Sequence, residues 1–249
     1  MKIIIDNLTK TFGEKVAINI DHYEISDGEM LGLVGNNGAG KSTLFRLILD
    51  LIKADNGKIL MRPAQNEVSE GISNTDVDVS KTEDWKDWTG AFIDESFLID
   101  YLTPDEYFQF IGRISNRTQE EVDDFLQSYQ QFMSGEVCGQ KKLIRNLSAG
   151  NKQKVGIIAA MLLQPKVLIL DEPFNFLDPS SQSAIKHLLQ EYNKQSGATI
   201  LISSHNLQHT VDICPRIALL ENGVIIRNID NVDGQAANEL ENYFQTRND

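Results

Sequence analysis

The sequence lacks the features that mark a membrane-spanning or exported chain. Its longest uninterrupted apolar run is Ile157 to Leu163, far below the ~18 residues that a membrane-spanning helix needs. The N-terminal stretch MKIIIDNLTK places Asp6 directly after three isoleucines, and this charge interrupts the apolar region that a signal peptide requires. These absences argue against a transmembrane helix and predict a chain that stays in the cytosol.

Cysteine and basic side chains are also scarce. The two cysteines, Cys138 and Cys214, are far apart and have no histidine cluster nearby, which argues against a zinc site and predicts buried free thiols. The 23 lysines and arginines are outnumbered by 36 aspartates and glutamates, which gives a net charge of -13. Because nonspecific binding to nucleic acids or anionic membranes needs a basic surface, this charge argues against both partners.

One segment carries a specific chemical pattern. Residues 35–43 read GNNGAGKST and follow the apolar run from Met30 to Val34, which matches the P-loop pattern G-x-x-x-x-G-K-[ST] between a strand and a helix. The glycines permit a tight loop whose backbone N–H groups surround an anion. Lys41 would then reach the β and γ phosphates, and the Ser42 hydroxyl would bind Mg²⁺. The segment therefore predicts a site for a nucleotide.

Two further groups of polar residues follow apolar runs later in the chain. The run at residues 167–170 ends in Asp171 and Glu172, and the run at residues 199–203 leads to His205. The carboxyl ends of parallel strands present ligand groups at one edge of a sheet. Beside a P-loop, one carboxylate can hold Mg²⁺ while its neighbour positions the attacking water. A lone histidine is more often structural, so His205 gains a functional reading only from this context.

The remaining pattern predicts alternating strands and helices. Thr103 and Thr118 each begin a capping box, which predicts a helix after each of them. Further helices are expected after Ser148 and over residues 180–195, and the acidic, aperiodic stretch at residues 62–86 predicts a loop. We expect short strands at residues 3–5, 16–20, 30–34, 58–61, 89–93, 167–170, 199–203 and 216–220.

The order of the motifs resembles that of the ATP-binding cassette (ABC) ATPases. The stretch Leu147 to Asn151, LSAGN, looks like the signature loop of that family, which is L-S-G-G-Q in its commonest form. In order, the chain shows GNNGAGKST, LSAGN, VLILDEP, FLD and SSH, and the resemblance extends from Lys2 to about Val224. It implies an α/β fold with a P-loop NTPase (RecA-like) core, an N-terminal antiparallel β subdomain and an inserted α-helical subdomain.

The resemblance also implies roles for individual residues. Phe12 sits where the family stacks an aromatic ring on adenine. Glu172 would activate the attacking water, His205 would contact the γ-phosphate, and Ser42 with Asp171 would hold Mg²⁺. The implied catalytic residues are Lys41, Glu172 and His205. The residues implied to surround the phosphates are Gly35, Asn36, Asn37, Gly38, Ala39, Gly40, Lys41, Ser42 and Thr43.

Three residues are implied to act on the nucleotide of another chain. In this family the signature loop completes the ATP site of the partner subunit, so Ser148 and Gly150 would face the γ-phosphate held by that partner. Asp178, in the FLD stretch, would lie at the same interface. Two chains would have to pair head to tail on ATP to complete both sites. The partner would be a second copy of the chain or a homologous ATPase subunit.

The chain departs from the commonest family pattern in the signature loop and after residues 89–93. Ala149 and Asn151 replace a glycine and a glutamine, and an alanine is well tolerated at a helix start. Where the family usually has a glutamine that senses the γ-phosphate and Mg²⁺, this chain has Asp94, with Glu95 as the alternative equivalent. A carboxylate can bind Mg²⁺ directly. Asp94 is therefore a candidate metal ligand that would change Mg²⁺ dependence or coupling.

Together these features predict the ATP-hydrolysing subunit of an ABC transporter, with ATP and Mg²⁺ as cofactors and a separate transmembrane permease as its partner. The chain would be cytoplasmic, peripheral on the membrane through its permease, and without a nucleic-acid partner. A soluble ABC ATPase outside transport and an ATP-binding regulatory module are the alternatives. The single nucleotide-binding domain would divide into an ATP-binding core (1–94 and 165–225), a helical subdomain (95–164) and a C-terminal helix and tail (226–249).

Overall fold

Two β-sheets and a group of helices form the fold, seen in a computed structural model that describes residues 1–63, 75–133, 135–231, 236–237, 239–240 and 243. The strands are β1 (Lys2–Phe12), β2 (Lys15–Ile25), β3 (Met30–Val34), β4 (Asn56–Arg62), β5 (Val77–Asp78), β6 (Thr89–Phe92), β7 (Val167–Leu170), β8 (Thr199–Ser204), β9 (Arg216–Glu221) and β10 (Val224–Asp230). The helices are α1 (Lys41–Ile48), α3 (Pro104–Ile114), α4 (Gln119–Ser128), α5 (Gln130–Met133), α6 (Ala149–Met161), α7 (Pro179–Ser196) and α8 (Leu207–Val211), with 3-10 turns η1 (Asp84–Trp88), η2 (Glu95–Phe97) and η3 (Ile144–Asn146).

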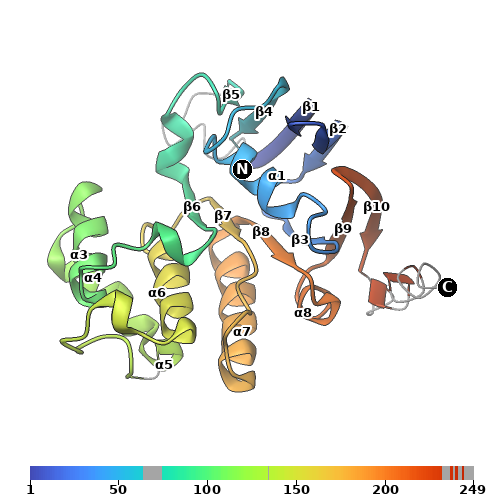
Figure 1. Ribbon diagram of the computed structural model, residues 1–249. Helices are drawn as coiled ribbons and strands as arrows, with labels where there is room; N and C mark the ends of the chain where they lie inside the picture. Colours follow the sequence, from blue (N-terminus) through green and yellow to red (C-terminus); the bar gives the residue numbers. More distant parts are fainter. Residues whose placement is uncertain (64–74, 134, 232–235, 238, 241–242, 244–249) are drawn as a thin grey trace.

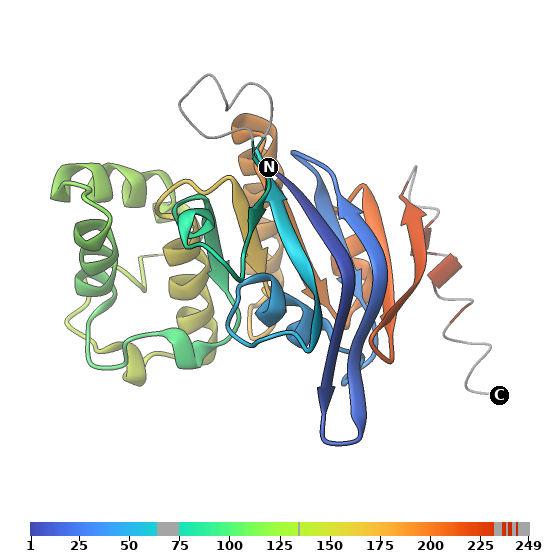
Figure 2. The same cartoon turned by 90° about the horizontal axis from the view of Figure 1, so that it is seen from above.

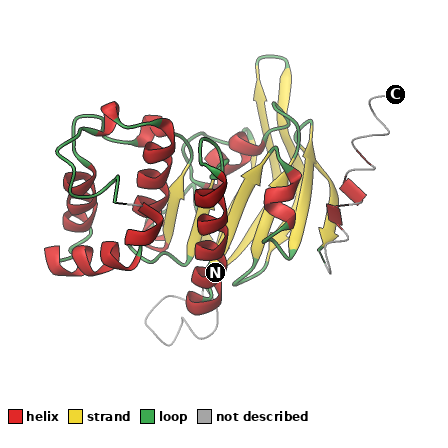
Figure 3. Ribbon diagram, turned by 90° about the horizontal axis from the view of Figure 1, so that it is seen from below, coloured by secondary structure: helices red, strands yellow, loops and turns green. Residues whose placement is uncertain are grey.

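The larger sheet has the strand order β10-β9-β3-β8-β7-β6. Its strands run parallel from β9 to β6, and β10 is antiparallel to β9. The smaller sheet, β2-β1-β4-β5, is antiparallel throughout and lies above the larger one in Figure 1. Figure 2 shows the β1–β2 hairpin extending beyond the other strands. Figure 3 shows α3, α4 and α5 gathered at the side of the molecule that is away from β9 and β10.

The central strands are those whose sequence is apolar without interruption. β7 reads VLIL and β3 reads MLGLV, and every residue of both strands is buried, as expected for parallel strands that are covered on both faces. β3 leads into Gly35, β7 into Asp171 and β8 into His205. Because these neighbouring strands are parallel, their carboxyl ends lie at one edge of the sheet. The fold therefore brings the three motif-bearing segments to the same edge.

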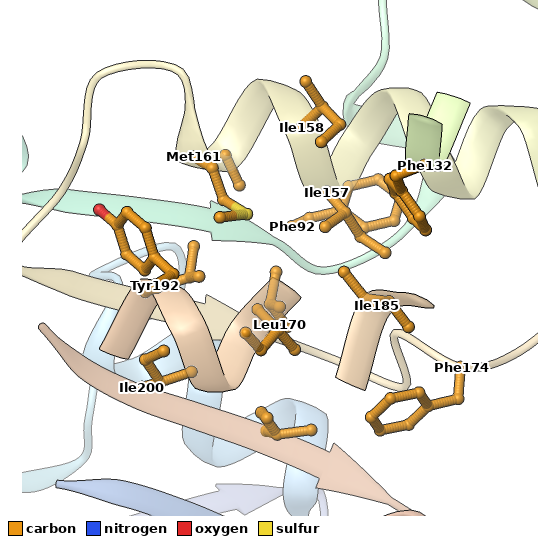
Figure 4. Close-up of a cluster of buried hydrophobic side chains, with 14 of the residues drawn as sticks. Phe92, Phe132, Ile157, Ile158, Met161, Leu170, Phe174, Ile185, Tyr192 and Ile200 are labelled. Carbon is orange, nitrogen blue, oxygen red and sulfur yellow. The ribbon is translucent and has the colours of Figure 1, made fainter. Parts of the chain in front are cut away.

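Helix α6 packs closely against β6 because a glycine faces the strand. A Cβ atom at Gly156 would lie 2.1 Å from a ring carbon of Phe92, so this approach requires glycine. Around this contact, buried side chains of α5, α6, α7 and strands β6 to β8 form one apolar cluster (Figure 4). The packing fixes α6, whose N-cap and first turn carry residues 148–151 of the LSAGN motif.

Helix α1 is held by its apolar face. Leu44, Phe45, Leu47 and Ile48 are buried and belong to a second apolar cluster, which joins the four-stranded sheet to the larger sheet. Lys41 is the first residue of this helix. The position of the P-loop is therefore set by a buried strand on one side and a buried helix on the other.

The structure confirms the two predicted capping boxes. Thr103 accepts a hydrogen bond from the backbone N–H of Glu106, Thr118 accepts one from that of Glu121, and each glutamate bonds back to the cap residue. The strands expected at residues 3–5 and 16–20 are longer in the structure. β1 and β2 run from Lys2 to Phe12 and from Lys15 to Ile25, because pairing in the β1–β2 hairpin continues to its tip. The helical pattern after Thr118 ends at Ser128, and α5 is a separate short helix.

The larger sheet extends past the predicted boundary of the ATP-binding core. Residues 226–230, assigned from the sequence to a C-terminal helix and tail, belong to β10, which pairs with β9. β10 reads VIIRNID, and its apolar and polar residues do not alternate as they would in a strand with one buried face. Of residues 234–249, the structure describes only 236–237, 239–240 and 243.

The predicted acidic loop is partly structured. Trp85, in η1, is buried and donates its indole N–H to the Val79 carbonyl at 3.0 Å, and β5 pairs with β4. Residues 64–74 lie outside the described part of the chain. Within the part that is described, no helix combines the length and the apolar character needed to cross a membrane.

Candidate nucleotide-binding and catalytic site

The P-loop joins β3 to α1, and its tight turn requires glycine. Gly40 precedes α1 with φ at 113°, and a Cβ atom there would lie 2.6 Å from the Ala17 carbonyl oxygen. Residues 36–39 form the tip of the loop, of which Ala39 is buried, and residues 41–43 begin the first turn of α1. The first N–H groups of a helix have no partner within the helix, so this turn can bind an anion.

Lys41, Glu172 and His205 meet beside the P-loop. The Lys41 ammonium donates to the Gly35 carbonyl at 2.7 Å and lies 3.6 Å from Glu172 Oε1. Glu172 Oε2 is 2.8 Å from His205 Nδ1 and accepts a hydrogen bond from the His205 backbone N–H at 3.2 Å. The structure therefore brings together the three residues predicted to be catalytic, although they come from separate parts of the chain.

Glu172 is held by its backbone as well as by its side chain. Its φ is 49°, and such left-handed backbone in a residue other than glycine costs of order 1–3 kcal/mol. Its N–H donates to Ser203 Oγ at 2.9 Å, and its carbonyl accepts from Gln153 Nε2 at 3.1 Å. The sequence pattern predicts no role for Ser203 or Gln153. The available signal for Ser203 was its place in the SSH stretch, whereas the burial of Gln153 in α6 is visible only in the structure.

Asp171 forms a buried group of oxygen atoms with two serines. Its carboxylate is nearly inaccessible and accepts hydrogen bonds from the Ser203 and Ser42 hydroxyls. Burial raises the pKa of Asp171, against the lowering effect of those bonds and of nearby Lys41. Carboxylate and hydroxyl oxygens are ligands that Mg²⁺ prefers. Ser42 and Asp171 therefore fit a magnesium ion.

Asp94, the candidate equivalent of the family's glutamine, contacts Ser96 and Arg46. Its Oδ1 accepts from the Ser96 N–H at 2.9 Å and from the Ser96 hydroxyl, and its Oδ2 lies 3.2 Å from Arg46 Nη2 on α1. Burial raises the pKa of Asp94, but the bonds from Ser96 and Arg46 outweigh it and lower that pKa overall. Glu95, the alternative, pairs with Lys152 at 3.0 Å. Ser96 and Arg46 thus engage both oxygens of Asp94, and its assignment to the metal stays a prediction.

The residues implied to act on a partner lie at the starts of α6 and α7. Ser148 caps α6 by accepting from the Asn151 N–H at 3.2 Å. A Cβ atom at Gly150 would lie 2.7 Å from the Phe176 carbonyl oxygen. Asp178 caps α7 and accepts from two serine hydroxyls and two backbone N–H groups of its first turn, which hold its pKa well below the usual range. Within one chain, Ser148 and Asp178 therefore act as helix caps.

Phe12 stands at the tip of the β1–β2 hairpin. It is the last residue of β1, it is 52% exposed, and it pairs across the hairpin with Lys15. The Lys10 ammonium lies 5.4 Å from the centre of its ring and pairs with Asp55 at 3.0 Å. The ring is therefore accessible for stacking on a base.

The sequence matches a known family along most of its length. A family model described as "ABC transporter" matches residues 18–175. The ABC transporter ATP-binding protein YhaQ of Bacillus subtilis is 32% identical over 223 residues, which cover 89% of this chain and 68% of that protein. The methionine import ATP-binding protein MetN of Carboxydothermus hydrogenoformans is 30% identical over 227 residues, which cover 90% of this chain and 65% of that protein.

Solved structures share the fold. The "Dimeric Structure of MJ0796, a Bacterial ABC Transporter Cassette" has a TM-score of 0.78 at 23% identity and covers 92% of this chain and 99% of its own. The "Structure of ATP binding subunit of ABC transporter" has a TM-score of 0.75 at 25% identity and covers 92% and 90%. The predicted combination of a P-loop core, an antiparallel sheet and a helical part is confirmed. By its motifs, its nucleotide site and these matches, the chain belongs to the ABC transporter family as an ATP-binding subunit.

Proposed function

We propose that this chain hydrolyses ATP and thereby energises transport through a separate membrane protein. The observation that carries the proposal is the meeting of Lys41, Glu172 and His205 beside the P-loop. Binding alone would need only the loop. A carboxylate 3.6 Å from the P-loop lysine and 2.8 Å from an imidazole nitrogen is suited to activating a water molecule next to a phosphate.

Each of the three residues would act through charge or orientation. Lys41 would stabilise the negative charge that develops on the transferred phosphoryl group. Glu172 would accept the proton of the attacking water, a contribution of roughly 10²- to 10⁴-fold in rate. His205 would hold that carboxylate through Nδ1 and offer its other ring nitrogen to the γ-phosphate.

Mg²⁺ would be held by Ser42 and Asp171. When bound, the ion would supply positive charge that offsets the negative charge of the phosphates. The buried carboxylate of Asp171, whose pKa is raised by burial, would gain a positive partner for its charge. Ser203 would orient this carboxylate and, through the Glu172 N–H, the neighbouring base.

We also propose that a complete site needs a second copy of the chain or a homologous subunit. The first turn of α6, with Ser148 and Gly150, offers N–H groups and a positive helix end that favour an anion. The γ-phosphate held by the P-loop of one chain would meet this turn of the other. Asp178 would lie at the same interface while capping α7. The dimeric arrangement described for MJ0796 supports this pairing.

The membrane-spanning part would belong to a separate permease, which would hold the chain at the cytoplasmic face of the membrane. MetN is named as an import ATP-binding protein, and the structural relative cbiO1 from Clostridium perfringens is described as part of the transporter complex cbiONQ. Both descriptions support a division of labour between an ATPase subunit and other chains.

Glu172→Gln tests the proposal. We expect wild-type protein to hydrolyse ATP with Mg²⁺, and we expect the variant to bind ATP but to turn over roughly 10²- to 10⁴-fold more slowly because it lacks the base. With ATP present, the variant should accumulate as a dimer in size-exclusion chromatography. Glu83→Gln is the matched control, since Glu83 is exposed and pairs only with Lys86 among the described residues. A Glu172→Gln protein with wild-type turnover would contradict the assignment.

A further inference from the structure

A lysine of the β1–β2 hairpin lies against the tip of the P-loop. Lys15 begins β2, directly across the hairpin from Phe12. Its ammonium nitrogen is 3.8 Å from the position that a Cβ atom would take at Gly38. Among the residues that the structure describes, no carboxylate pairs with Lys15. Its charge is therefore available to a ligand at the P-loop.

A pocket of about 300 Å³ opens at this contact. It is lined by Lys15, by residues 36–39 of the P-loop, by residues 219–222 at the end of β9, and by Tyr243. The acidic side chain in this lining, Glu221, accepts a hydrogen bond from the Tyr243 hydroxyl at 2.6 Å. On the side of the β1–β2 hairpin, the pocket is therefore lined by the tip of the P-loop and by the positive charge of Lys15.

Lys15 and Lys41 approach the P-loop from different sides. The Lys41 ammonium lies at the Gly35 carbonyl and near Glu172, which places it at the end of the site where hydrolysis occurs. Lys15 lies beside the loop tip and next to Phe12, where the base would stack. If the base of a nucleotide stacks on Phe12 and its last phosphate lies near Glu172, the phosphate attached to the ribose is the one that lies nearest Lys15.

We propose that Lys15 is a second phosphate-binding cation of the nucleotide site and holds the phosphate nearest the ribose. The inference rests on the proposed function, because it takes the P-loop as an ATP site. In a chain with a net charge of -13, a local cation would also offset the repulsion between the protein and a polyphosphate.

The position of Lys15 predicts an effect on binding and not on the chemical step. The phosphate nearest the ribose is distant from the bond that breaks, so the contact is equally strong before and during hydrolysis, and such a contact changes KM without changing kcat. A charge-assisted hydrogen bond at an exposed position supports a loss of about five- to tenfold in affinity. ATP and ADP should lose affinity equally, because both carry this phosphate.

Calorimetric titration of the full chain with ATP and with ADP tests the proposal. We expect Lys15→Gln to weaken both nucleotides about five- to tenfold and to raise the KM for ATP equally at constant kcat, while Lys15→Arg stays near wild type because it keeps the charge. Lys58→Gln is the matched control, since Lys58 lies on β4, outside the pocket, 4.0 Å from Asp6. Lys15 is exposed, so its substitution should leave the thermal unfolding transition unchanged.

Three results would overturn the proposal while leaving the proposed function intact. They are a Lys15→Gln affinity within about twofold of wild type, an equal loss in Lys58→Gln, and an equal loss in Lys15→Arg, which would indicate packing in place of charge. A wild-type chain that binds neither nucleotide would overturn both the inference and the proposed function.

Discussion

Replacing Asp94 separates two roles that its carboxylate could have, as a partner of Arg46 or as a ligand of Mg²⁺. The Arg46 and Asp94 side chains are 42% and 40% exposed and 3.2 Å apart, and ion pairs this exposed contribute about 0.5 kcal/mol. Asp94→Asn should therefore lower the free energy of unfolding by about that amount, because asparagine can still cap Ser96. Asp94→Ala also removes the cap, which adds about 1 kcal/mol.

A double-mutant cycle isolates the ion pair. Urea unfolding of Asp94→Asn, Arg46→Met and the combined variant should give a coupling energy of about 0.5 kcal/mol at neutral pH. The folded-state pKa of Asp94 is lowered. The contribution of the pair should therefore be complete above the unfolded carboxyl pKa of about 3.9 and be lost as the pH falls through the lower folded value.

The dependence of ATP hydrolysis on Mg²⁺ concentration decides between the two roles. We expect Asp94→Asn to keep the wild-type half-saturating Mg²⁺ concentration, since Ser96 and Arg46 engage its oxygens in the structure. Asp171→Asn is the positive control and should lose this Mg²⁺ response. A shift of about tenfold or more in Asp94→Asn, the size that follows loss of a contact supporting a metal, would show that Asp94 acts on Mg²⁺. A coupling energy of zero would show that its pairing with Arg46 contributes nothing to stability.

Two further predictions concern stability. Gly156→Ala should lower the free energy of unfolding, measured in urea, by about 1–3 kcal/mol. The new methyl group would overlap the Phe92 ring, and this overpacking outweighs the ~1 kcal/mol that alanine usually adds to a helix. Equal or higher stability of the variant would contradict this. Phe176 has φ at 63° and is 74% exposed, so Phe176→Gly should raise that free energy by about 0.5–1 kcal/mol by relieving backbone strain. A lower melting temperature would show that the ring is needed for packing.

Features with a local cause were predictable from the amino-acid sequence. The P-loop was predictable because a tight anion-binding turn needs glycines at fixed spacing, followed by a lysine and a hydroxyl. The capping boxes at Thr103 and Thr118 were predictable for the same reason, since cap and glutamate are three residues apart. The apolar run of β7 predicted a central strand, and its position before Asp171 and Glu172 predicted which end of that strand carries chemistry.

Contacts between residues that are distant in the sequence were visible only in the folded chain. That Glu172 lies between Lys41 and His205 depends on the order β3-β8-β7 in the sheet, which no local pattern contains. In the sequence Asp94 is a candidate metal ligand, and only the packing of α1 shows that Arg46 lies beside it. Likewise, Lys15 is an ordinary surface lysine in the sequence, and the fold of the β1–β2 hairpin brings it to the P-loop. Local geometry depends on neighbouring residues, whereas contacts between strands and helices depend on burial that involves the whole chain.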